Sequence, residues 1–264
     1  FEPIREYLEN KSAKINLPEC AVPIIAIPTT AGTGSEVTKW ATVWDTEKNR
    51  KHSLSRHDLY PTHAIIDPEL MLPLPLDHTI STGLDALSHS LESIWNINAN
   101  PISSNYAIAA SRRILNYLHK LANDLENLNY RTMIAEAALY AGLAFSNTRT
   151  ALAHSLSYPI TLHHGIPHGI ACSFTLPVIM SSVIGAKTSV DVSLREIFGE
   201  DLEAGIIQLE TFIKDLNVPL SPEEYGIEAS SWRIWVENAL DGERGLNFVG
   251  KPEHATRALH AIMS

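Results

Sequence analysis

The spacing of apolar residues changes along this chain of 264 residues. Between residues 20 and 75 the apolar residues form short runs, AVPIIAIP and HAIID, and the segments KWATVWD and KHSLS flank the turn-like tetrapeptide TEKN. Short apolar runs bounded by proline and polar turn residues are typical of strands. We therefore predict strands and a hairpin in this part of the chain.

After Pro75 the apolar residues recur at the spacing of a helix. From Asp77 to about Phe145 one such stripe consists of Ile80, Leu84, Leu87, Leu91 and Ile94. Glycine, which destabilises helices, is nearly absent there. The segments SFTLPVIMSSVIG, EAGIIQLETFIKDL and SWRIWVENAL read as further helices separated by proline or glycine. The pattern predicts an α/β plus all-α fold, with a partial α/β domain over residues 1–75 and a helical domain over residues 76–264.

Composition and charge exclude several classes of function. A hydrophobic fraction of 45% is enough for a buried core. The net charge of −10 and the lack of a long Lys/Arg run argue against a nucleic-acid partner. The sequence contains neither an apolar stretch of roughly 18 residues nor a basic-then-apolar opening segment, so we expect no membrane association and a cytoplasmic location.

The chain opens with Phe1 rather than Met, and its first residues, FEPIREYLENKSAKINLPECAVP, read as a polar helix and loop. We therefore expect that an N-terminal part precedes this segment. Cys20 and Cys172 are far apart and form no CxxC pair. This arrangement fits free thiols in a reducing compartment, and we expect neither cysteine to be a metal ligand.

One candidate for chemistry is the pair Asp85 and His89, which are four residues apart in STGLDALSHSLES. On a helix they project from one face, which differs from the leucine face. An Asp–His pair of this spacing is also common on exposed helices. Alone it favours that simpler interpretation over metal binding.

A cluster of histidines in ALAHSLSYPITLHHGIPHGIACS favours metal binding over an ordinary exposed Asp–His pair. We expect Pro159 and Gly165-Ile166-Pro167 to break this segment, so that His154 near one helix end and His168 near the start of the next helix can face a common point. One carboxylate and three imidazoles suit a divalent cation such as Fe(II) or Zn(II) with an open position for substrate. The adjacent His163 and His164 are expected to line the site or to lie just outside the ligands rather than to bind the ion.

The loop PTTAGTGSEVT follows an apolar strand and offers hydroxyl and backbone N–H groups to a phosphate. The residues concerned are Thr29, Thr30, Thr33, Gly34 and Ser35. The loop matches neither the Rossmann nor the Walker A pattern, so an ordinary polar turn is the alternative.

Taken together, PTTAGTGSEVT, AIIDPEL, TGLDALSHSLE, GLAFSNTRTALAHSLSYP and GIPHG occur in the order and spacing of the iron-containing (group III) alcohol dehydrogenases. The resemblance runs from about residue 22 to residue 175. It implies an N-terminal α/β dinucleotide-binding domain and a helical metal-binding domain of the dehydroquinate synthase-like fold, with the active site between them. In this family the threonine-rich loop contacts the nicotinamide dinucleotide, NAD or NADP.

The same resemblance assigns residues. The metal ligands fall on Asp85, His89, His154 and His168, and the lysine near the cofactor corresponds best to Lys51. Two features depart from the family. The GGGS-type phosphate-binding segment of the family has no counterpart in this sequence. Many relatives also have a histidine where Tyr158 stands, so Tyr158, together with His164, is our candidate for the proton relay.

The segment SNTRTALAHSLSYPIT, together with TVWD, is most similar to the phosphonoacetaldehyde reductase branch of the family. Arg149, five residues before His154, can offer a phosphonate two parallel hydrogen bonds, although a surface ion pair at a helix end explains it equally well. The substrate implied is a small aldehyde or primary alcohol, and because relatives are often dimers or larger, a homodimer is the assembly to consider.

The resemblance implies hydride transfer between NAD(P)H and an aldehyde whose oxygen is polarised by the metal, with Fe(II) expected and Zn(II) as the alternative. Two rival functions remain open from the residues alone. One is a metal-dependent hydrolase or lyase on the same helical site. The other is a non-catalytic fragment that lacks part of its cofactor site.

Overall fold

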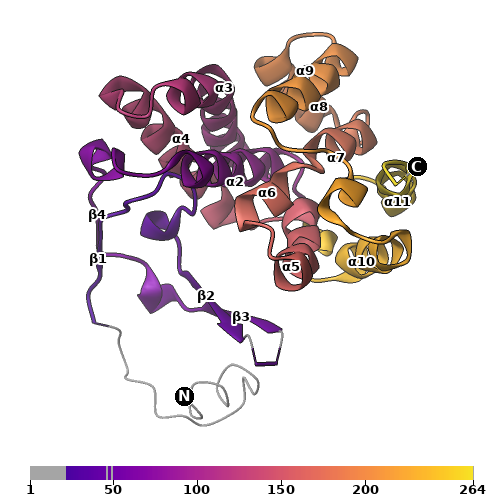
Figure 1. The fold of residues 1–264 in the computed structure, drawn as a ribbon, viewed down its shortest axis with the longest axis horizontal. Coiled ribbons are helices and arrows are strands. Elements are labelled where there is room, and N and C mark those ends of the chain that lie inside the picture. Colours follow the sequence, from indigo (N-terminus) through magenta and orange to yellow (C-terminus); the bar gives the residue numbers. More distant parts are fainter. Residues whose placement is uncertain (1–21, 46, 49, 264) are drawn as a thin grey trace.

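The computed structural model describes residues 22–45, 47, 48 and 50–263, and the side chains of residues 44, 50 and 51 lie outside this description (Figure 1). Cys20 and the opening segment, which we predicted to be a polar helix and loop, also lie outside it. Figure 1 shows the strands on one side of a larger group of helices. The predicted fold class, a remnant of an α/β unit followed by a helical part, is confirmed.

The described residues before Leu76 form two small sheets and three short 3-10 helices. Strand β1 (Ile25–Ala26) pairs in parallel with β4 (His63–Ala64). Strands β2 (Trp40–Asp45) and β3 (Arg50–Ser55) form an antiparallel hairpin with Trp40 opposite Ser55. The predicted hairpin is therefore confirmed. The 3-10 helices are η1 (Ser35–Val37), η2 (His57–Leu59) and η3 (Pro68–Met71).

The rest of the described chain is helical, as the spacing of its apolar residues predicted. The long helices α2, α3 and α4 come first, followed by shorter ones and two 3-10 turns. Their bounds are α2 (Leu76–Ile94), α3 (Pro101–Asn123), α4 (Leu128–Thr148), α5 (Leu152–His164), α6 (His168–Ser173), α7 (Leu176–Val183), α8 (Thr188–Phe198), α9 (Leu202–Asp215), η4 (Pro222–Tyr225), α10 (Ala229–Asp241), η5 (Gly245–Asn247) and α11 (Pro252–Ala261).

Helix α2 is the centre of the helical part. It packs against α3, α4, α5 and α6, and residues 83–96 are all buried (Figure 1). Because both its faces are covered, α2 buries polar residues as well as its leucine stripe, and those polar residues must find partners inside the protein. Among the described residues, none of the helices combines the length and the apolar character that crossing a bilayer requires.

The structure corrects one detail of the predicted helices. We expected Pro159 to break its segment, but α5 continues through Pro159 and ends at His164. Proline removes one backbone donor, yet the packing of α5 against α2, α6 and α10 outweighs that local cost. The break falls at Gly165, which has a φ of 66°. The division into two domains near residue 75 stays a prediction, although α2 begins there.

Candidate metal centre

Helix α2 presents Asp85 and His89 on one face, as their spacing predicted. Both are 5% exposed. Oδ1 of Asp85 lies 3.8 Å from Nε2 of His89. The other ring nitrogen of His89, Nδ1, lies 3.2 Å from the carbonyl oxygen of Gly32, to which it can only donate. The proton of the neutral ring is therefore on Nδ1, and the lone pair of Nε2 faces Asp85. A histidine that binds a metal through Nε2 has this tautomer.

His154, on helix α5, lies beside Asp85 and is held there by Glu92. Glu92 is a residue that we missed in the sequence. Glu92 is fully buried on α2 and accepts a hydrogen bond of 2.6 Å from Nδ1 of His154. It also accepts from the backbone N–H groups of Ala151, Ala153 and His154, at the start of α5. A carboxylate at a helix N-terminus satisfies orphan donors and the helix dipole. Its position three residues after His89 was the available signal.

This carboxylate also orients the imidazole. Because Nδ1 of His154 donates to Glu92, Nε2 faces Asp85, whose Oδ1 is 3.4 Å away. A carboxylate behind a metal-binding histidine is the usual outer-shell arrangement: it fixes the tautomer and raises the basicity of the ring. His154 is 3% exposed.

His168 is the first residue of α6, and its Nε2 lies 4.0 Å from Oδ1 of Asp85. Its Nδ1 lies 3.3 Å from the hydroxyl of Ser157. The side chain is 32% exposed, so the centre is open on this side. Close packing of α6 on α2 sets its position: a Cβ added to Gly169 would lie 1.8 Å from the carbonyl oxygen of Ser81.

Gly169→Ala is therefore expected to push α6 away from α2. The added methyl group has no room against backbone atoms, and overpacking of this kind lowers the free energy of unfolding by about 3 kcal/mol. Displacement of α6 also moves His168, so metal retention should fall. Denaturant unfolding and metal analysis measure both effects.

Gly185→Ala is the matched control, because nothing lies within 4 Å of a Cβ added at Gly185, so only the backbone cost of its φ of 77° is tested. It should keep the metal. Full stability and metal content in Gly169→Ala would contradict the packing argument.

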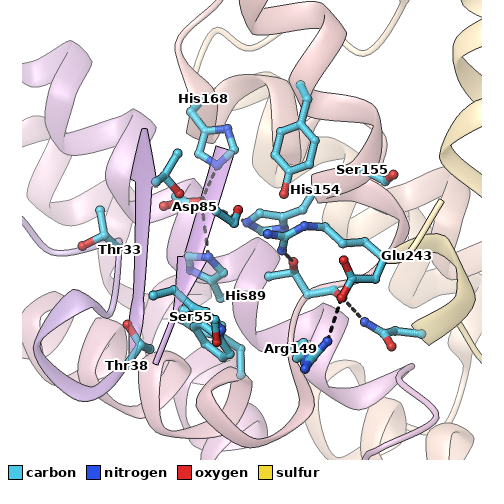
Figure 2. Close-up of a pocket in the computed structure, with 18 of the residues that line it drawn as sticks. Thr33, Thr38, Ser55, Asp85, His89, Arg149, His154, Ser155, His168 and Glu243 are labelled. Carbon is cyan, nitrogen blue, oxygen red and sulfur yellow. Dashed lines mark hydrogen bonds and ion pairs between the residues drawn. The ribbon is translucent and has the colours of Figure 1, made fainter. Parts of the chain in front are cut away.

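The four predicted ligand residues thus converge from three helices. Figure 2 shows Asp85 with His89, His154 and His168 around it. Oδ1 of Asp85 and Nε2 of His154 are buried and have no hydrogen-bond partner. Two buried polar atoms left in this state are costly, and a divalent cation bound between them would satisfy both. The donor set therefore fits a metal such as Fe(II) or Zn(II).

The charges around the site favour deprotonated ligands at Asp85 and His89. Burial raises the pKa of Asp85, but the neighbouring His89, His154 and His168 outweigh it and lower the pKa below the ordinary value. Burial lowers the pKa of His89 to about 4. For His154 burial acts in the same direction, but Cys172 and Glu92 outweigh it and raise the pKa well above 6.5.

Cys172 is a neighbour of this site that the sequence analysis did not place there. It lies one turn after His168 on α6, is buried, and has its Sγ 3.7 Å from each ring nitrogen of His168. One ligand atom each from Asp85, His154, His168 and Cys172 lie within 4.8 Å of one another. Burial raises the pKa of the thiol, but His154 and His168 outweigh it and lower the pKa to about 6.

A cavity of about 900 Å³ opens beside these residues. Its lining comes from the helices and from the hairpin side, which contributes Thr33, Ser35 and Thr38 among others. Figure 2 shows Thr33, Thr38 and Ser55 across the cavity from His154 and Arg149. Of the loop residues predicted to bind the cofactor, Thr33 and Ser35 line the cavity, with their hydroxyls 3.0 Å apart. Thr29 and Thr30 are not among its lining residues.

Gly34, also predicted to bind the cofactor, has a packing role. Its φ is 60°, and a Cβ there would lie 2.7 Å from Cα of Gly142 on α4. The glycine is therefore required where the loop approaches the helix. The side chain of Lys51 lies outside the described residues, so its predicted contact with the cofactor stays a prediction.

Arg149 lines the cavity, but its guanidinium is paired. Its Nη1 donates to Oε1 of Glu243 at 2.9 Å, and the two side chains are 54% and 82% exposed. The residue caps the C-terminus of α4 with a φ of 66°. The structure thus shows the surface ion pair at a helix end that was the alternative to a substrate contact.

The two residues predicted for proton transfer lie in different surroundings. Tyr158 lines the cavity, and its ring stacks 6.2 Å from the ring of His168. Burial raises the pKa of Tyr158 to about 12. His164 contacts the ring of Trp235 and is not among the residues lining the cavity, and His163 also stacks on Trp235. The role of Tyr158 and His164 in a proton relay stays a prediction.

Comparison with known families matches most of the chain. Residues 79–259 match the C-terminal part of the Fe-containing alcohol dehydrogenase family, and residues 2–68 match the iron-containing alcohol dehydrogenases. The chain is 34% identical over 229 residues to an NAD-dependent methanol dehydrogenase from Bacillus methanolicus, covering 83% of this chain and 60% of that protein. The chain thus spans about 60% of the length of this curated relative.

Two reductases of anionic aldehydes are also similar. A phosphonoacetaldehyde reductase from Streptomyces viridochromogenes is 38% identical over 157 residues, which are 59% of this chain and 40% of that protein. The structure of a sulfoacetaldehyde reductase from Bifidobacterium kashiwanohense, solved in complex with NAD+, superposes with a TM-score of 0.89 at 29% identity. It covers 99% of this chain and 69% of that one.

Proposed function

The chain belongs to the Fe-containing alcohol dehydrogenase family, and from this membership we propose that it is the metal-binding part of an NAD(P)-dependent alcohol dehydrogenase or aldehyde reductase. The observation that carries the proposal is that Asp85, His89, His154 and His168 converge beside a large cavity. Two of their buried atoms, Oδ1 of Asp85 and Nε2 of His154, have no hydrogen-bond partner. We propose these four residues as the metal ligands, with Fe(II) expected and Zn(II) as the alternative.

A bound divalent cation would supply Lewis-acid polarisation of a carbonyl oxygen, and a bound nicotinamide would supply or accept the hydride. The chain's own residues prepare the site. Glu92 holds His154 in the tautomer that leaves Nε2 free, and the Gly32 carbonyl does the same for His89. The exposed side of His168 faces the cavity through which a substrate enters.

Tyr158 is our candidate for handling the proton. With its pKa raised to about 12 the hydroxyl stays protonated at neutral pH, so it can donate a hydrogen bond to a developing alkoxide. Thr33 and Ser35, on the opposite wall, are our candidates for contacts with the cofactor. NAD or NADP and a homodimeric assembly stay predictions from the family resemblance.

The substrate that we propose is a small aldehyde or primary alcohol, with phosphonoacetaldehyde and its product 2-hydroxyethylphosphonate as the preferred pair. The similarity to a phosphonoacetaldehyde reductase and to a sulfoacetaldehyde reductase supports an aldehyde with a tetrahedral anionic group. A second arginine on the cavity wall, Arg244, supports it independently.

The proposal is tested by the oxidation of NADH and NADPH at 340 nm with small aldehydes, before and after chelation. We expect metal-dependent and cofactor-dependent turnover. His168→Ala should lose bound metal and turnover together, because one of the four ligands is removed. His78→Ala, an exposed histidine on the same helix as Asp85, is the control and should keep both. Full activity in His168→Ala without bound metal would contradict the assignment.

A further inference from the structure

A second arginine lines the cavity beside the candidate metal centre. Arg244 follows α10 and lies close to residues of α5. Its guanidinium carbon is 5.3 Å from the centre of the Tyr158 ring, and its Nη1 donates to the hydroxyl of Thr150. The Tyr158 ring also stacks on His168, so the guanidinium and this candidate ligand contact the same ring and line the same cavity.

The backbone around Arg244 is held on several sides. Its carbonyl accepts from the N–H of Asn247 at 3.0 Å, and the amide of Asn247 donates to the carbonyl of Thr150 at 2.9 Å. A Cβ added to Gly245 would lie 2.0 Å from the carbonyl oxygen of Ala239. The loop is thus fixed against α5 and α10, and the guanidinium is oriented before any ligand arrives.

The charges on this wall leave Arg244 as the residue suited to an anion. Arg149 is already paired with Glu243, and Figure 2 shows that pair well away from His168. The first N–H groups of α5 are taken by Glu92. Among the described residues no carboxylate pairs with Arg244, and only one of its five N–H donors has a partner.

We propose that Arg244, together with the hydroxyl of Thr150, forms a subsite for the phosphonate or sulfonate group of a short aldehyde. A planar guanidinium forms two parallel hydrogen bonds with a tetrahedral oxyanion, and this guanidinium lies over the Tyr158 ring on the wall of the cavity. The carbonyl end of the same molecule then lies toward the metal ligands. This inference rests on the proposed function and names its specificity residue.

The subsite is tested without turnover by the calorimetric binding of ethylphosphonate and ethanesulfonate to the metal-loaded enzyme. Neither probe has a carbonyl group, so binding reports the anion subsite. We expect Arg244→Gln to weaken binding about 10- to 100-fold, the usual range for a charge-assisted contact. Arg233→Gln, an exposed arginine on α10, is the control and should bind normally. Weakened binding in Arg149→Gln with normal binding in Arg244→Gln would overturn the proposal.

A kinetic comparison separates specificity from structural damage. Arg244→Gln should lower kcat/KM for phosphonoacetaldehyde by the same factor but leave 3,3-dimethylbutanal, a neutral aldehyde of similar shape, within about threefold of wild type. Arg244→Lys should restore part of the lost kcat/KM, because lysine keeps the positive charge but cannot form the two parallel hydrogen bonds of a guanidinium. Equal losses on both aldehydes would overturn the proposal.

The two experiments distinguish this inference from the proposed function. Anion binding that depends on Arg244, without any reduction of aldehydes, would refute the dehydrogenase proposal and support the subsite. Reduction of neutral and anionic aldehydes with equal kcat/KM in wild type and Arg244→Gln would support the dehydrogenase and refute the subsite.

Discussion

Asp85→Asn is expected to lose most of its bound metal and nearly all activity. Oδ1 of Asp85 lies 3.4–4.0 Å from the Nε2 atoms of His89, His154 and His168, and it is the atom that all three face. The amide keeps the shape of the side chain but removes the negative charge that attracts a cation. The loss of metal affinity should exceed the roughly 10- to 100-fold cost of removing an outer-shell partner.

Metal content after dialysis and NAD(P)H oxidation measure this effect. Asp77→Asn, an exposed position in the first turn of the same helix, is the matched control and should behave like the wild type. If Asp85→Asn retained metal with wild-type affinity, the ligand assignment of Asp85 would be wrong.

Glu92→Gln is expected to have the second large effect, on stability as well as on metal affinity. One carboxylate oxygen accepts from Nδ1 of His154 and from Ala151, and the other from Ala153 and His154. An amide replaces one acceptor with a donor that faces other donors. Loss of a buried charged partner costs about 3–5 kcal/mol of unfolding free energy, and metal affinity should fall about 10- to 100-fold.

Denaturant unfolding and metal titration measure both changes, with Glu237→Gln, an exposed position on α10, as the control. The stabilisation also depends on pH. Burial raises the pKa of Glu92, but His154 outweighs it and the pKa in the fold is below 4.5. The contribution is therefore present above pH 4.5 and is lost as pH falls through the lower folded value. Equal acid stability of wild type and Glu92→Gln would contradict this role.

The sequence predicted the elements because their signals are local. The hairpin has turn residues between two segments of strand character, and the helices have apolar residues at a period of 3.6. The choice of Asp85 and His89 likewise follows from a spacing of four residues on one helix. The prediction of a break at Pro159 was wrong because the local cost of a proline inside α5 is outweighed by the packing of α5 against other helices. That packing cannot be read from the local sequence.

The outer partners of the candidate site had no such signal. Glu92 reaches residues about sixty positions later in the chain, and Arg244 meets Thr150 across 94 positions. Contacts of this separation depend on which helices pack together. From the sequence we therefore chose Arg149, which is near His154 in the chain, and missed Arg244, which meets Thr150 and Tyr158 only in the fold.

The sequence by itself determined the candidate ligand types, their spacing on each helix and the family to which the chain belongs. The tertiary structure decided how they meet. Helix α6 approaches α2 closely only because residue 169 is glycine, Glu92 joins α5 to α2, and the loop before η5 brings a guanidinium over Tyr158. The physical reason is that periodicity specifies which face of an element is buried, whereas close packing and buried hydrogen bonds specify which faces touch.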